Sequence, residues 1–248
     1  MNIWAYSLIS VSIISLVSFV GLFFLALKKE ALQRILLFLV SFSAGGLLGG
    51  AFIHLLPEAV NLLGLGFRLS LAILFGILVF FILEKFIFWR HCHLPTDKPH
   101  PHPLAFMNLL GDILHNFIDG IVVTSSFLVS IPLGLTTAFA VLLHQIPKEI
   151  GDCSILIYSG FSKVKSLFLN FASALSALVG ALLILIIGTK FAEFNKLIIP
   201  FAVGSFIYVA GSDLIPELHK ETGVKKSALQ LLGLILGIGA MAVLALLE

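Results

Sequence analysis

Charged residues are scarce in this sequence. Only 11% of its 248 residues are Asp, Glu, Lys or Arg, whereas 59% are hydrophobic, and the mean hydropathy is +1.13. Soluble domains carry roughly a quarter of charged residues, so this scarcity excludes an ordinary soluble globular protein. An integral membrane protein remains, with the lipid bilayer as a partner and no nucleic acid among the expected partners.

Cysteine is equally scarce. Cys92 falls in a polar stretch and Cys153 lies near the end of an apolar run. Two cysteines so placed make no disulfide framework and do not identify a redox compartment. The fold class must therefore be read from the apolar runs.

Long apolar runs occupy most of the chain. A membrane-spanning helix needs about 20 mainly apolar residues. Eight such runs cover residues 3–27, 32–56, 66–89, 104–130, 132–159, 166–188, 197–216 and 227–247. We therefore predict an all-α membrane protein with eight transmembrane helices in a single domain, residues 1–248. The first run lacks the basic stretch and cleavage pattern of a signal peptide, so we expect it to be a membrane helix too.

Basic residues follow the alternation of these spans. One side of the membrane collects Lys28, Lys29, Arg34, Lys85, Arg90, Lys98, Lys163, Lys165, Lys220, Lys225 and Lys226. The other side has Arg68, Lys190 and Lys196, and Lys148 lies within the membrane. Lys and Arg are enriched on the cytoplasmic side. We expect both termini outside, in a cell inner or plasma membrane.

Two consecutive runs carry the polar residues that stand out most. The fourth run contains Asp112, His115, Asn116 and Asp119, and the fifth contains His144, Gln145, Lys148, Glu149 and Asp152. Such groups are costly at bilayer depth and mark functional sites. Spacings of three and four residues place each set along one helical stripe. We predict that the two stripes face each other and form a divalent-metal site.

The types of side chain indicate the ion. Imidazole and carboxylate ligands suit Zn²⁺ and related ions such as Fe²⁺, Mn²⁺, Co²⁺ and Cd²⁺, whereas an all-oxygen set favours Mg²⁺ or Ca²⁺. We expect the metal to be a transported substrate, with no catalytic cofactor. Pro147, which lacks an N–H group and clashes with the carbonyl four residues back, should loosen the helix near Leu143.

Three other interpretations of these stripes stay open. They can form an internal hydrogen-bond network, or a proton relay of Asp112, Asp119 and His115 in a transporter of a non-metal solute. An intramembrane metallohydrolase would activate water near Glu149, but the sequence has no His-Glu-x-x-His pair. We favour a metal transporter over an enzyme.

Polar residues near the ends of other runs are candidates for the path by which a cation reaches and leaves the site. These residues are His54, Glu58, Asp112, Asp213, Glu217 and His219. The stretch His54-Leu-Leu-Pro-Glu58 is echoed by Asp213-Leu-Ile-Pro-Glu217. One copy is expected at the outer end of the second helix and the other at the inner end of the seventh. This placement predicts inverted repeats of three helices on either side of the fourth and fifth, a 3+2+3 arrangement.

The segment 90–103 combines histidine, cysteine and proline. Its potential metal ligands are His91, Cys92, His93, His100 and His102. Short Cys/His-rich tracts are compatible with metal binding, and a plain Pro-rich linker is the alternative. We expect a cytoplasmic loop that captures metal without fixed geometry.

The two central motifs, His115-Asn-Phe-Ile-Asp-Gly120 and His144-Gln-Ile-Pro-Lys-Glu-Ile-Gly-Asp152, make the chain resemble the ZIP family of zinc and iron transporters. The resemblance extends along nearly the whole length and implies uptake of metal into the cytoplasm. By motif position, His115, Asp119 and His144 look like ligands of the primary metal site. Asn116 and Gln145 look like members of an adjacent secondary site. The chain's expected partners are the divalent ion and the bilayer, with a homodimer as an option.

Lys148 departs from the family pattern, which usually has a carboxylate or histidine there. Where some bacterial relatives supply a further carboxylate from a Ser-Glu-Pro-Leu-Gly stretch, this chain has Ser176-Ala-Leu-Val-Gly180. We expect the Lys148 ammonium to occupy the secondary position, supported by Asp119 or Glu149, in a centre that holds one ion. The alternative is a deprotonated Lys148 that donates a lone pair to the metal, which would link metal entry to proton release.

Overall fold

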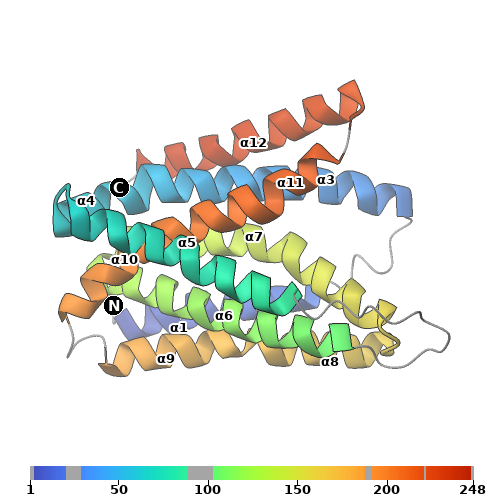
Figure 1. Ribbon diagram of the computed structural model, residues 1–248, viewed down its shortest axis with the longest axis horizontal. Coiled ribbons are helices and arrows are strands. Elements are labelled where there is room, and N and C mark those ends of the chain that lie inside the picture. The colour runs from blue at the N-terminus through green and yellow to red at the C-terminus, as the bar shows by residue number, and fades with distance from the viewer. Residues whose placement is uncertain (1–2, 21–28, 89–102, 188–191, 221, 247–248) are drawn as a thin grey trace.

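The computed structural model describes residues 3–20, 29–88, 103–187, 192–220 and 222–246, and all regular elements within these ranges are helices (Figure 1). In order they are α1 (Ile3–Leu16), η1 (Val17–Phe19), α3 (Lys29–Gly49), η2 (Gly50–Leu55), α4 (Leu56–Leu63), α5 (Phe67–Phe88), α6 (Pro103–Val129), α7 (Ile131–Tyr158), α8 (Lys163–Ala174), α9 (Ser176–Ile187), α10 (Ala192–Tyr208), η3 (Val209–Leu214), α11 (Ile215–His219) and α12 (Val224–Ala245). The all-α prediction is confirmed for these residues. The candidate loop ligands His91, Cys92, His93, His100 and His102 lie outside the described ranges.

Six helical segments of the described chain are long and apolar enough to cross a membrane. They are Ile35–Leu63, Phe67–Lys85, Asn108–Val129, Lys163–Ile187, Lys196–His219 and Val224–Ala245. The prediction of eight spans also includes α1, which with η1 is apolar but shorter, and α7. The α7 helix has 28 residues, and its polar side chains include those of the central motif. These polar residues lower the hydropathy of α7, which is not among the six segments.

Close helix contacts set the position of α6. A side-chain carbon added to Gly120 of α6 would lie 1.9 Å from the carbonyl oxygen of Ala177 on α9, and one added to Gly180 would lie 2.2 Å from that of Phe117. Only glycine permits this approach, as is usual where membrane helices pack closely. Ala177 therefore lies at the α6–α9 contact. The pairs α3–α12 and α5–α10 use glycines in the same way, with Gly45 and Gly237 in one and Gly76 and Gly204 in the other.

Two π-helical turns interrupt long helices at corresponding points. The η2 turn precedes α4, which has Pro57 near its start, and η3 precedes α11, which has Pro216 near its start. Each proline lacks an N–H group and clashes with the carbonyl four residues back, and the wider turn accommodates that clash. In Figure 1, α4 and α11 lie toward opposite ends of the bundle.

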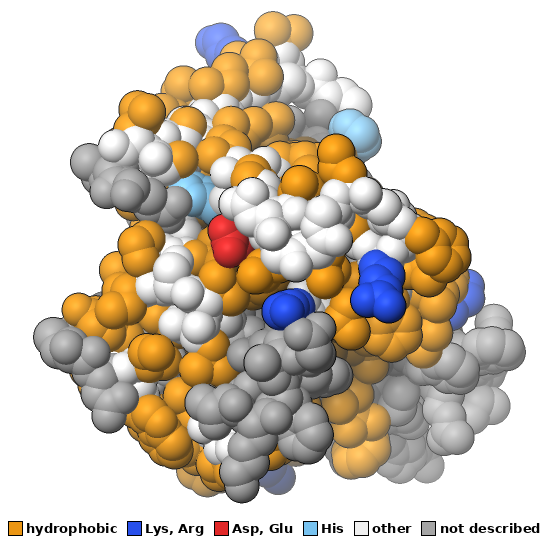
Figure 2. Space-filling view, turned by 90° about the vertical axis from the view of Figure 1, so that its left-hand side faces the viewer, with side chains coloured by type: hydrophobic (Ala, Val, Ile, Leu, Met, Phe, Trp, Pro, Cys, Tyr) orange, Lys and Arg blue, Asp and Glu red, His pale blue; other side chains and the backbone are white. Residues whose placement is uncertain are grey.

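A hydrophobic layer fills the bundle on the α4 side of the central motifs. It includes Val123 of α6, Val141 of α7, Leu47 of α3 and Phe206 of α10, each at most 2% exposed. Figure 2 shows the molecule from the α4 end, where hydrophobic side chains cover most of the visible surface and charged side chains lie singly. These side chains separate the central polar groups from the α4 end.

Candidate metal site

His115, Asp119 and His144 converge between α6 and α7. The two imidazole Nε2 atoms are 3.2 Å apart, and Oδ2 of Asp119 lies 3.3 Å from Nε2 of His144 and 3.5 Å from Nε2 of His115. In tetrahedral zinc sites with bonds of about 2.0–2.2 Å, neighbouring ligand atoms are about 3.3–3.6 Å apart. The triangle therefore has the size of one face of such a site. A fourth corner is left for water or another donor.

Burial makes this cluster suitable for a cation. The side chains of His144 and Asp119 are 2% and 5% exposed, and that of His115 is 14% exposed. Apart from the two imidazole nitrogens, Oδ2 of Asp119 has no polar partner in the described part of the chain. A buried carboxylate oxygen without donors is costly. A bound cation would remove that cost.

The environment of His144 favours metal binding through Nε2. Its Nδ1 lies 3.3 Å from the carbonyl oxygen of Ala140, which can only accept a hydrogen bond. A proton on Nδ1 would be accepted by this carbonyl and would leave the Nε2 lone pair for a metal beside Asp119. The ring of Phe80 contacts that of His115 edge-on, and the ring of Phe206 contacts that of His144. These contacts limit rotation of both imidazoles.

Pro147 leaves one carbonyl of its helix without the usual hydrogen bond. Because it has no N–H group, it cannot bond to the carbonyl of Leu143. The hydroxyl of Ser43 on α3 donates to that oxygen at 2.5 Å. The loosened carbonyl beside His144 is therefore held by a neighbouring helix rather than by its own.

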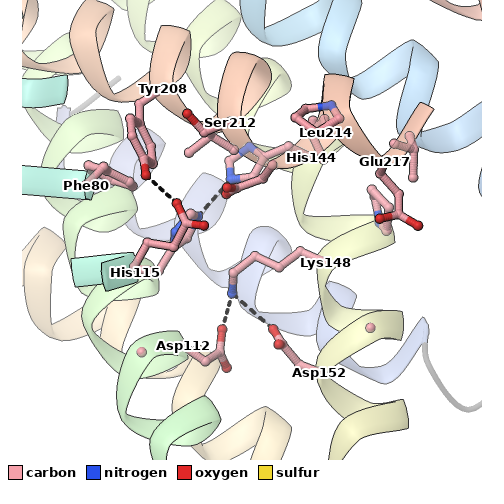
Figure 3. Close-up of a pocket in the computed structure, with 18 of the residues that line it drawn as sticks. Phe80, Asp112, His115, His144, Lys148, Asp152, Tyr208, Ser212, Leu214 and Glu217 are labelled. Atoms are coloured by element: carbon pink, nitrogen blue, oxygen red, sulfur yellow. Dashed lines mark hydrogen bonds and ion pairs between the residues drawn. The ribbon is translucent and has the colours of Figure 1, made fainter. Parts of the chain in front are cut away.

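Lys148 lies between two carboxylates, one on α6 and one on its own helix (Figure 3). Its ammonium forms an ion pair with Asp112 and lies 3.2 Å from Oδ2 of Asp152. Of the two carboxylates expected to support Lys148, Glu149 acts on it only through its charge, and the direct ion pairs are made with Asp112 and Asp152 instead. Asp112, predicted as part of the polar stripe and of a path or relay but not as a partner of Lys148, forms the closer ion pair.

The remaining polar residues of the two motifs bond to one another. Asn116 donates to Oδ1 of Asp112 at 2.7 Å, and Gln145 donates to the side-chain oxygen of Asn116. Glu149 accepts from Gln145 at 3.4 Å and from Asn170 of α8 at 2.5 Å. The internal hydrogen-bond network, one of the alternative interpretations, exists and lies beside the three-residue cluster.

Sequence analysis missed two members of this network, Asn170 and Ser173 on α8. Ser173 donates to Oδ2 of Asp112, and both residues are buried. They are polar, three positions apart and within a predicted membrane span. That spacing is a usable signal, since polar residues on one face of a membrane helix point to a partner inside the bundle.

A cavity of about 570 Å³ leads from the cluster toward α11. His115 and His144 line one part of it, followed by Asp112, Lys148 and Asp152. The opposite wall comes from α5, the last residue of α10, η3, α11 and the residue after α11, and it includes Glu84, Tyr208, Asp213, Glu217 and Lys220. In Figure 3, Tyr208 and Glu217 lie in the upper part of the view, and the tip of Lys148 points away from them to Asp112 and Asp152.

Only some of the residues that were expected along the cation's path line the cavity. Asp112, Asp213 and Glu217 line the cavity, whereas His219 does not. His54 is 4% exposed and its Nε2 lies 2.8 Å from the carbonyl oxygen of Met241, away from the cavity. Glu58 is half-buried and has Asn61 at 3.4 Å.

The sequence model of the family described as ZIP zinc transporter matches residues 1–105 and 96–245. The chain belongs to the ZIP zinc transporter family. Its resemblance to that family, first seen in the two central motifs, is thereby confirmed. Membership makes the chain a multi-pass membrane protein with metal transport as its general activity.

Named relatives from several animals are similar over most of their length. Zinc transporter zipt-7.1 of Caenorhabditis briggsae is 30% identical over 317 aligned residues, which cover 100% of this chain and 80% of the relative. Zinc transporter ZIP13 of Danio rerio is 33% identical over 275 residues, with 89% and 79% covered. Zinc transporter SLC39A7 of Homo sapiens is 29% identical over 339 residues, with 100% and 72% covered. All three names describe transporters rather than enzymes.

Proposed function

We propose that this ZIP family member moves Zn²⁺, or a divalent ion of similar chemistry, into the cytoplasm through a site made by His115, Asp119 and His144. The observation that carries the proposal is the triangle of ligand atoms, 3.2 to 3.5 Å on a side. The names of the relatives support zinc as the substrate.

The composition of the cluster suits a transported ion rather than a permanently held one. Two neutral imidazoles and one carboxylate offer three ligands and a single negative charge. Structural zinc sites usually have four protein ligands, so an ion here keeps one exchangeable position. The incoming cation sheds part of its water on binding, and water returns at the open corner as it leaves.

The arrangement of cavity and hydrophobic layer supports an inward-facing state. The cluster is open toward α11 through the cavity, while Leu47, Val123, Val141 and Phe206 fill the other side. Transport then requires a second state in which these apolar side chains separate and the cavity closes. Alternating access of this kind is general among secondary transporters.

The same proposal includes eight membrane spans in one domain, with α1 and α7 counted among them. The start of α1 and the end of α12 lie toward the α4 end (Figure 1). Lys163 and Lys165 lie at the start of α8, and Lys225 and Lys226 at the start of α12, near the opposite end. This distribution supports termini outside and the cavity facing the cytoplasm.

The inverted 3+2+3 repeat is also part of the proposal. Two features support it: a π-helical turn followed by a proline occurs in both halves, and α4 and α11 lie toward opposite ends of the bundle. The pairing is reciprocal as well, because η2 packs against α10 and η3 packs against α3. Inverted repeats of this kind place the substrate site at their interface.

Uptake into liposomes tests the function. Purified protein is reconstituted and the initial uptake of Zn²⁺, Fe²⁺, Mn²⁺, Co²⁺ and Cd²⁺ is measured, with and without a proton gradient. The proposal predicts saturable uptake of Zn²⁺ or one of these ions, lost in His115→Ala and His144→Ala. Proton-driven uptake of a solute in chelated medium, with no metal uptake, would refute the proposal and favour a transporter of a non-metal solute.

A further inference from the structure

We propose that the Lys148 ammonium occupies a second cation position beside the His–Asp cluster, and that it limits the site to one transported ion. The inference rests on the proposed function, because it assumes that the cluster binds the transported cation. Figure 3 shows the arrangement, with the tip of Lys148 reaching the carboxylates of Asp112 and Asp152 below His115 and His144.

The oxygens around Lys148 form a place built for a cation. Asp112 is 3% exposed and belongs to α6, whereas Asp152 belongs to α7. Glu149 is fully buried one residue along from Lys148. Carboxylates inside a bilayer require compensating positive charge. Among the described residues, Lys148 is the one cation that is ion-paired to Asp112 and Asp152.

Other groups hold these oxygens in place independently of the lysine. Both oxygens of Asp112 accept hydrogen bonds, one from Asn116 at 2.7 Å and the other from Ser173. Gln145 is fully buried and continues the network, yet its own Oε1 has no donor in the described part of the chain. This buried acceptor without a donor belongs to the same network as Asp112, to which Gln145 is linked through Asn116.

The lysine fits this place as a tethered substitute for an ion. An ammonium is a compact charge with three donors and forms no coordination sphere. It neutralises the carboxylates of Asp112 and Asp152 and repels a second divalent ion that approaches from the cavity. Its removal should leave an oxygen-rich position, which favours harder cations such as Mn²⁺ or Mg²⁺ more than the His–Asp cluster does.

Metal content measures the number of ions directly. All variants carry Ala in place of His91, Cys92, His93, His100 and His102, so that the loop adds no zinc. Protein in detergent is equilibrated with Zn²⁺ or Mn²⁺, and bound metal per chain is determined by mass spectrometry of the digested sample. The otherwise unmodified chain and a control, Lys165→Gln on the exposed start of α8, should each bind one Zn²⁺. Lys148→Gln and Lys148→Glu should bind two, and Mn²⁺ binding should rise at least tenfold.

The outcomes separate this inference from the proposed function. Two Zn²⁺ in the chain with Lys148 intact, or one Zn²⁺ in both Lys148 variants, would overturn the inference while leaving uptake through the cluster standing. If neither His115→Ala nor His144→Ala lowers the zinc content, the proposed function fails instead.

A second measurement applies if the Lys148 variants do not fold. Anomalous scattering from Cd²⁺ bound to the unmodified chain should give one strong peak at His115, Asp119 and His144. A peak between Asp112 and Asp152 would overturn the inference.

Discussion

Nε2 of His144 lies 3.3 Å from Oδ2 of Asp119, across the contact between α7 and α6. Neither residue is near the other in sequence, and the close approach of Gly120 and Ala177 fixes the helix that carries Asp119. The pair therefore joins a close helix contact, that of Gly120 with Ala177, to the buried cluster of potential ligands. A small shift of either helix changes the size of the ligand triangle, so packing and metal affinity are coupled.

Removal of any one ligand should abolish most uptake. His115→Ala and His144→Ala each take away an imidazole, and Asp119→Asn takes away the negative charge while nearly keeping the shape. Changes to groups that only orient ligands cost about 10–100-fold in affinity, so we expect at least a 100-fold loss of initial zinc uptake. Asn61→Ala, near the α4 end, serves as a control for expression and insertion. Normal uptake by any of the three ligand variants would show that the cation binds elsewhere.

Ser43→Ala should destabilise the protein through the carbonyl of Leu143. Pro147 cannot donate to this oxygen, so the variant leaves it buried without a partner at a cost of about 1–3 kcal/mol. The measurement is thermal unfolding in detergent. In the Pro147→Ala background, where residue 147 regains its N–H group, Ser43→Ala should cost much less. Equal losses in the two backgrounds would refute the proposed link between Ser43 and Pro147.

Gly120→Ala should separate α6 from α9, because the new methyl group would lie 1.9 Å from the Ala177 carbonyl oxygen. Overpacking typically costs about 1–3 kcal/mol, and zinc affinity should fall as well, since α6 carries two ligands. Gly239→Ala is the matched control: it is also within a helix, and a methyl group there has no atom within 4 Å. The contact argument fails if both variants behave alike in thermal unfolding and zinc binding.

The histidines of the 90–103 segment should modulate transport without being required for it. Pro-rich sequence does not hold a fixed ligand geometry across a membrane. Replacing His91, His93, His100 and His102 together by Ala should leave measurable zinc uptake in liposomes. A variant that inserts normally and has lost all uptake would assign this segment an essential role.

Much of the candidate site could be predicted because helical periodicity is a local property. The spacing of His115 and Asp119, and the polar row that begins at His144, are enough to place ligands on two helical stripes. Asp152, four residues after Lys148 on the same helix, follows from this periodicity, but the ion pair of Lys148 with Asp112 was not predictable in this way. That pair depends on which turn of α6 lies opposite residue 148, and this is set by the glycine contacts of α6 rather than by the motif itself.

The fold, too, was predictable only in part. Apolar runs predicted the helices, and the repeated Pro-Glu motif indicated corresponding positions at Pro57 and Pro216. The π-helical turns before these prolines were not foreseen, because an extra residue in a turn leaves no hydropathy signal. The role of Ser43 was likewise not foreseen, since it requires the free carbonyl of Leu143 on another helix.

The most direct measurement of the central claim is the zinc X-ray absorption spectrum of the protein, recorded in the background without loop ligands. If His115, Asp119 and His144 bind the transported ion, the spectrum should show two imidazoles and additional oxygen at about 2.0–2.2 Å. His144→Ala should reduce this to one imidazole and weaken binding. A zinc spectrum and affinity that are unchanged in His144→Ala would contradict the account.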